Sequence, residues 1–121
     1  MQHFLDPFAF SNMRSLAQVN INCKYISILQ GTFQGCTNLQ SISLPHNTSY
    51  IDDFAFSNCK NLHEFEMPMH LNEIGSSVFS NCSKLSRLTY QGTLEPLYYA
   101  DTFKDTNNNI YVKSDTYKDK T

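Results

Sequence analysis

The cysteines are the residues of this chain with the widest chemical repertoire, since a thiol can attack a substrate, bind a metal or form a disulfide. The chain has four, Cys23, Cys36, Cys59 and Cys82. They form no CxxC pair, the spacing of zinc knuckles and thioredoxin-like redox sites. The last three recur every 23 residues, each three positions after a phenylalanine and three before a leucine. Their role therefore depends on what repeats around them.

Other residue types give little indication of catalysis. The histidines His3, His46, His63 and His70 are scattered, and no second histidine joins His70 and Glu73 at metal-ligand spacing, so we interpret this pair as a solvated turn. Glu64 and Glu66 could do acid–base chemistry, but neither a cleft nor a partner is implied for them. The dispersed glycines form no phosphate-binding loop. We predict no enzyme, with no catalytic, cofactor-binding or metal-binding residues and no cofactor.

Charge and hydropathy exclude two classes of partner. The 121 residues include 9 basic and 11 acidic ones, a formal charge of -2, which gives no electrostatic reason to expect nucleic acid or an anionic membrane. No apolar run approaches the roughly 20 residues that span a bilayer, so we expect no membrane insertion in this chain. The first residues do not have the basic segment and apolar stretch of a signal peptide. The localisation stays unknown at this level.

The whole chain is built from a repeat of about 23 residues. Phe10, Phe33, Phe56 and Phe79 are spaced by 23, and Phe103 follows after 24. We call equivalent positions of successive repeats a column. Five further columns are apolar, and they hold Leu5, Ile28, Ile51 and Ile74; Met13, Cys36, Cys59 and Cys82; Leu16, Leu39, Leu62 and Leu85; Val19, Ile42, Phe65 and Leu88; and Ile21, Leu44, Met67 and Tyr90.

One unit predicts one strand and one turn. Phe65 and Met67 alternate with glutamates, the period of a strand with one buried face, and Pro68 ends the run. Apolar residues at every third position from Phe56 to Leu62 favour short helical or 3₁₀ turns. A unit this small buries its core only against neighbouring units. We predict an α/β repeat solenoid with a parallel sheet on one face and the helical turns on the other.

The unit I-x-x-x-[AV]-F-x-x-C-x-x-L-x-x-[IFL]-x-[LM]-P resembles the BspA-type leucine-rich repeat. The copies most like it are IDDFAFSNCKNLHEFEMP, Ile51 to Pro68, and IGSSVFSNCSKLSRLTY, Ile74 to Tyr90. The resemblance covers about residues 5 to 117, and YQGTLEP and NIYVKSDTYKD resemble the closing segment of such arrays. It implies one leucine-rich-repeat domain over residues 1–121, of about four to five repeats, with a partial first repeat in 1–10 and a closing segment in 91–121. The first unit departs from the pattern, with Met13 in the cysteine column and Asn22 in the proline column.

The repeat indicates that the in-register cysteines are buried free thiols. Their column accepts Met13, so it requires a soft apolar side chain rather than a nucleophile. Neighbouring coils at ~4.7–4.9 Å are also spaced wider than the ~3.5–4.5 Å between the Cβ atoms of a disulfide. Cys23 lies out of register, and we expect a half-exposed turn thiol.

The outward strand positions are the candidate site. They vary while the inward ones keep their type, and solenoids use such extended faces for recognition. We predict a protein-binding sheet face formed by Gln18, Asn20, Ser41, Ser43, Glu64, Glu66, Arg87, Thr89, Tyr111 and Lys113. The resemblance implies a non-enzymatic surface or adhesion protein whose partner is a host or matrix protein.

An alternative is a structural segment that caps a longer array and has no ligand of its own. Leu5, Phe8 and Phe10 begin within a repeat, so the first coil should expose apolar surface and allow self-association through this N-terminal edge. Two glycosylation sequons, at Asn47 and Asn81, would matter only for secretion from a eukaryotic cell. We expect the first in an exposed turn and the second partly hidden by Cys82.

Overall fold

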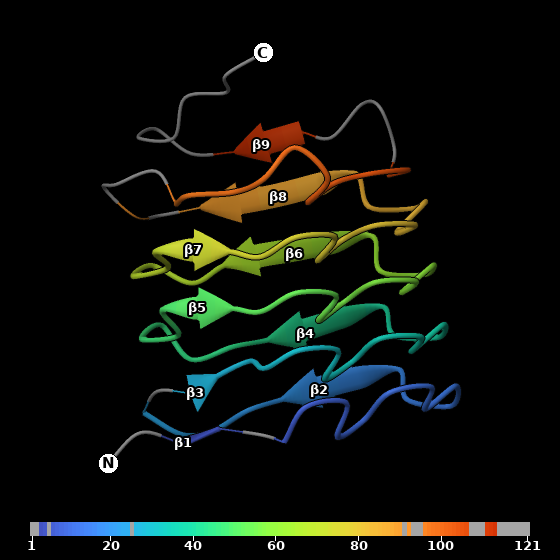
Figure 1. Cartoon of the computed structure of the whole chain (residues 1–121), viewed down its shortest axis with the longest axis horizontal. Helices are drawn as coiled ribbons and strands as arrows, with labels where there is room; N and C mark the ends of the chain where they lie inside the picture. Colours follow the sequence, from blue (N-terminus) through green and yellow to red (C-terminus); the bar gives the residue numbers. More distant parts are fainter. Residues whose placement is uncertain are drawn as a thin grey trace.

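The structure is a computed structural model of the chain, and it describes residues 3–4, 6–24, 26–90, 92, 96–106 and 111–113. Successive coils stack along one axis, from β1 at one end to β9 at the other (Figure 1). The strands within the described ranges are β1 (His3–Phe4), β2 (Gln18–Asn20), β3 (Ile26–Ser27), β4 (Ser41–Ser43), β5 (Tyr50–Ile51), β6 (Glu64–Met67), β7 (Glu73–Ile74), β8 (Arg87–Tyr90) and β9 (Tyr111–Lys113).

The strands β2, β4, β6, β8 and β9 lie side by side in two parallel sheets on the side where one parallel sheet was predicted, and we call this side the sheet face. Residues that pair across neighbouring strands are one repeat apart in the sequence, as are Gln18 and Ser41, and Glu64 and Arg87. Inward residues of β6 are buried and outward ones exposed, which is the predicted alternation. The hydrogen bonds do not run through the whole face: β2 pairs with β4, and β6 with β8 and β9, while β4 and β6 are neighbours without a shared ladder.

The return segments, which begin near the Ile51 column, form a second row of short parallel strands (Figure 1). β1 pairs with β3 and β5 with β7, and isolated bridges join Ile28 to Ile51 and Glu73 to Leu97. Each coil therefore contributes a strand to two faces. The buried isoleucine column makes this second row possible, since Ile28, Ile51 and Ile74 each point inward and are at most 1% exposed.

The predicted helical or 3₁₀ turns are not confirmed, because the described residues contain no helix. Residues 52–62 form successive tight turns instead, with three-residue hydrogen bonds such as Ser57 N to Phe54 O at 3.0 Å and Cys59 N to Phe56 O at 3.2 Å. Phe54 and Asn58 have φ of 61° and 62°. This left-handed conformation ends a right-handed helix after each turn. The same conformation recurs at Phe8 and Ser77, at Gly31, and at Asn12, Gly35, Asn81 and Asp105.

The left-handed residues let the turn segments join one another, and we call this side of the stack the turn face. Phe54 N donates to Ser76 O, and Asn58 N donates to Ser80 O, at 3.1 and 2.9 Å. Asn12 N donates to Gln34 O in the same way. A continuous 3₁₀ helix would use these N–H groups internally, whereas here alternate ones satisfy carbonyls of the next coil.

A ladder of phenyl rings runs through the core. Phe10, Phe33, Phe56, Phe79 and Phe103 stack with ring centroids 5.4 to 5.7 Å apart and planes within 8°. Such parallel, offset stacking is a favoured arrangement of aromatic pairs. The 23-residue period thus places one ring of each coil on the ring of the next.

Candidate protein-binding face

The structure places the predicted binding residues along the sheet face. The side chains of Gln18, Asn20, Ser43, Glu64, Glu66 and Arg87 are exposed, and those of Ser41 and Thr89 are half-buried. Tyr111 and Lys113 lie in β9, where their backbones pair with Arg87 and Thr89. Their side chains lie outside the described part of the structure. The face is therefore polar over four strands, with its charge concentrated on β6 and β8.

Among the described side chains of the sheet face, Glu64 and Arg87 form an ion pair, and Glu66 has no charged partner. Arg87 Nη1 lies 4.0 Å from Glu64 Oε2 across the ladder, with both side chains about half exposed. Such exposed pairs contribute ~0–1 kcal/mol because water and salt screen them. Glu66 stands opposite Thr89, and no cation among the described residues pairs with it. Glu66 is therefore available to a cationic group of a ligand.

A seam lies between β4 and β6, at the centre of this face. Two adjoining hollows open along it, of about 190 and 90 Å³. Both are bordered by Ile42 and Glu66, and the larger one also by Glu64, Phe65 and Arg87. The hollows lie where the sheet ladder is interrupted, so the seam gives an otherwise regular face a place of distinct shape.

The coils on either side of the seam are held together elsewhere. On the turn face Phe33 N donates to Ala55 O at 2.9 Å and Gly35 N to Ser57 O at 2.8 Å, and on the return side Asp52 N donates to Ile28 O at 2.8 Å. The interruption is therefore local to the sheet face, where side chains of both coils border the hollows.

The cysteine column is packing, as predicted. Cys36, Cys59 and Cys82 are fully buried free thiols. The Sγ of Cys59 donates to Phe33 O at 3.2 Å and that of Cys82 to Phe56 O at 3.1 Å, in each case in the preceding coil. Burial raises the pKa of these thiols, that of Cys82 to about 12. A buried thiol with a raised pKa is a poor nucleophile, since the thiolate is the reactive form. Cys23 is half-buried, as expected.

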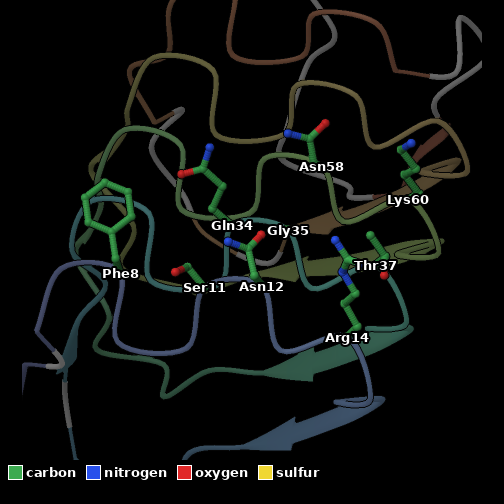
Figure 2. A pocket seen from close by; sticks show the side chains of 9 residues that line it. All are labelled: Phe8, Ser11, Asn12, Arg14, Gln34, Gly35, Thr37, Asn58 and Lys60. Carbon is green, nitrogen blue, oxygen red and sulfur yellow. The ribbon is translucent and has the colours of Figure 1, made fainter.

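Sequence reasoning missed a further hollow, which lies on the turn face. We call it the turn-face hollow; it has a volume of about 540 Å³ and spans the first three coils (Figure 2). Its border is formed by Phe8, Ser11, Asn12, Arg14, Gln34, Gly35, Thr37, Asn58 and Lys60. The sequence does contain a sign of this hollow. In two columns the second coil has a small residue, Gly35 or Thr37, where the first and third coils have larger ones.

The remaining predicted positions have structural roles or are exposed. Asp52 Oδ1 accepts hydrogen bonds from Asp53 N and from the Tyr50 hydroxyl, so this carboxylate stabilises the local turn. Asn47 lies in an exposed turn, and Asn81 is exposed although Cys82 after it is buried.

Within the described ranges, no three His, Cys, Asp or Glu side chains are grouped so that they could hold a metal ion. The same residues include no helix that is long and apolar enough to cross a membrane.

Two solved structures are similar to this one. The crystal structure of a leucine-rich repeat protein from T. pallidum superimposes with a TM-score of 0.72 and 28% identity, over 85% of this chain and 48% of that one. A leucine-rich repeat protein from Bacteroides ovatus gives a TM-score of 0.57 and 21% identity, over 85% and 36% of the two chains, and shows the fold alone. The chain thus spans about half the length of the first protein.

No curated protein matches the sequence. The family model of the BspA type leucine rich repeat region matches residues 3–115 with six copies. The match covers most of the chain, and its repeats agree with the stacked parallel coils of the structure. The chain belongs to the BspA-type leucine-rich repeat family.

Proposed function

We propose that this chain is a non-enzymatic protein-interaction module that binds its partner with the sheet face, centred on the seam between β4 and β6. The observation that carries this proposal is Glu66, an exposed carboxylate that borders both hollows and has no ion-pair partner among the described residues. A basic side chain of an extended partner segment would complement it. Leucine-rich repeat solenoids commonly present such faces to protein ligands.

Family membership supports a place for this module at a cell surface, with a host or matrix protein as ligand. BspA-type repeats are typical of surface-associated bacterial proteins, and the sheet face is polar enough to remain exposed there. Adhesion is thus the biological role that we propose for the face.

The test is a charge reversal with a matched control. Glu66→Lys should weaken binding to the matrix protein that the unchanged chain captures best from a purified panel by at least about tenfold, or ~1.4 kcal/mol. Asp6→Lys makes the same change of charge at an exposed position away from the seam, and it should have little effect. Equal losses in the two variants would mean that net charge, not the sheet face, determines binding.

A structural function is the second candidate, favoured by the first coil. Its Phe8, Phe10 and Met13 side chains are 46%, 36% and 45% exposed. Apolar surface of this kind favours contact with a further coil or a second copy. Sedimentation of the isolated chain tests this candidate: a monomer at high concentration would argue against self-association, and Phe8→Ser should abolish any dimer observed.

A further inference from the structure

The turn-face hollow exists because the second coil is small where its neighbours are large. Gly35 lies in the column of Asn12 and Asn58, and Thr37 in the column of Arg14 and Lys60. Figure 2 shows Thr37 between Arg14 and Lys60, and Gly35 between the two asparagines. The two cationic side chains come from coils two steps apart, roughly 9–10 Å along the stack. The floor of the hollow is therefore formed by the small residues Gly35 and Thr37, and a cationic side chain lies on each side of it.

The charge around this hollow is of one sign. Its border includes Arg14 and Lys60 and no carboxylate. Among the described residues the one ion pair is that of Arg87 with Glu64, on the sheet face, so no acid there neutralises either cation of the hollow. This excess is local, since the chain as a whole carries a formal charge of -2. A carboxylate is a natural complement to an arginine and a lysine.

Recognition in this hollow has to come from side chains. The backbone N–H groups of Asn12, Gly35 and Asn58 already donate to carbonyls of the next coil, at 2.7 to 2.9 Å. A Cβ at Gly35 would overlap with Asn12 Oδ1, so a larger side chain there requires that the Asn12 side chain move. The small residues Gly35 and Thr37 thus leave the hollow open, with polar side chains around it.

The uncharged side chains favour a polyhydroxyl ligand. Ser11, Gln34, Thr37 and Asn58 each have groups that donate and accept hydrogen bonds, as a sugar hydroxyl does. Phe8, 46% exposed, lies at the end of the border away from Arg14 and Lys60 (Figure 2), where it offers an apolar ring to a neighbouring unit of a longer saccharide. An acidic side chain also complements the two cations, and its peptide amides can meet the same polar groups, so an acidic peptide is the competing ligand in the test below.

We propose that the turn-face hollow binds an acidic sugar unit, with its carboxylate between Arg14 and Lys60 and its hydroxyls on the amide and hydroxyl side chains. The site is independent of the sheet face, which lies on another side of each coil. Because the hollow is open and its cations are exposed, a single sugar unit binds weakly, in the millimolar range.

The proposal is tested by NMR titration of the complete chain with methyl glucuronide, and with methyl glucoside as the neutral analogue of the same ring. The glucuronide should shift the side-chain amide signals of Asn12, Gln34 and Asn58, and the glucoside should bind at least about tenfold more weakly, or ~1.4 kcal/mol. Arg14→Ala and Lys60→Ala should each weaken glucuronide binding about fivefold or more, as expected for lost charge-assisted hydrogen bonds. Lys104→Ala removes an exposed cation outside the hollow and should have no effect.

These substitutions keep the fold, because both side chains are exposed and the Arg14 carbonyl, which accepts from Asn38 Nδ2, remains. An unchanged melting temperature verifies this. Three results would overturn the proposal: no amide shifts with the glucuronide, equal binding of glucoside and glucuronide, or tighter binding of a glutamyl dipeptide than of the glucuronide. The last would assign the hollow to acidic peptides.

Discussion

Replacing Cys59 by alanine tests whether the cysteine column is packing. Cys59 is fully buried, and its Sγ donates to Phe33 O at 3.2 Å. The substitution removes one buried heavy atom, a change comparable to Ile→Val at ~0.5–1.5 kcal/mol. It also removes a weak hydrogen bond, but Phe33 O still accepts from Cys36 N at 3.2 Å and so is not left unpaired. We expect a total loss of about 1–2 kcal/mol.

Urea unfolding followed by circular dichroism measures this loss. In a chain of this size it corresponds to a fall in melting temperature of roughly 3–6 °C per kcal/mol. Met13→Ala is the matched control, since Met13 stands in the same column but is 45% exposed, and we expect a change within about 0.5 kcal/mol.

Two results would refute this reasoning about Cys59. If Cys59→Ala were as stable as the unchanged chain, the column would not be packing. If it kept its stability but lost binding to the partner, Cys59 would be part of a site. The packing interpretation requires that the folded variant bind as the unchanged chain does.

Two further predictions concern pH and backbone conformation. Burial raises the pKa of the Cys36, Cys59 and Cys82 thiols, so the native state keeps protons that the unfolded chain loses. Stability from these thiols is full below their unfolded pKa of about 8.5 and falls as pH rises further, by up to ~1.4 kcal/mol per pH unit for each thiol. Urea unfolding between about pH 7 and about pH 10 should show this fall, and Cys82→Ala should reduce its slope; a flat profile would contradict the burial. For the left-handed residue Asn58, with φ of 62°, Asn58→Val should lower the free energy of unfolding by about 1–2 kcal/mol, whereas Asn58→Gly should leave it nearly unchanged. Equal effects of the two substitutions would mean that side-chain contacts, not backbone conformation, select asparagine there.

Much of the architecture could be predicted because one period acts on every residue type. The phenylalanine column predicts one recurring packing position in each coil, and the alternation of Phe65 and Met67 with two glutamates predicts an inward and an outward side of β6. Stacked coils repeat the same environment, so a residue type that recurs at one position reports the burial there. The outward positions follow from the same alternation, and the structure places them on one face.

The helical turns were predicted from spacing alone, and spacing cannot distinguish a 3₁₀ helix from a row of tight turns with three-residue hydrogen bonds. The difference lies in the sign of φ at Phe54 and Asn58. Phenylalanine gives no hint of a left-handed conformation, and asparagine only a weak one. The conformation is stable because the N–H groups that it redirects find carbonyls of the next coil, which exist only in the stacked structure.

The sequence by itself determined the repeat, the buried columns, the buried thiols and the polarity of the sheet face, because each follows from side-chain type at a fixed interval. Only the tertiary structure decided where that regularity is broken. The seam between β4 and β6 depends on whether hydrogen bonds form between coils. The turn-face hollow depends on Gly35 and Thr37 lying between longer side chains of the coils on either side. The seam and the turn-face hollow each depend on how residues about 23 positions apart in the sequence lie next to one another. Those residues become neighbours only when the coils stack.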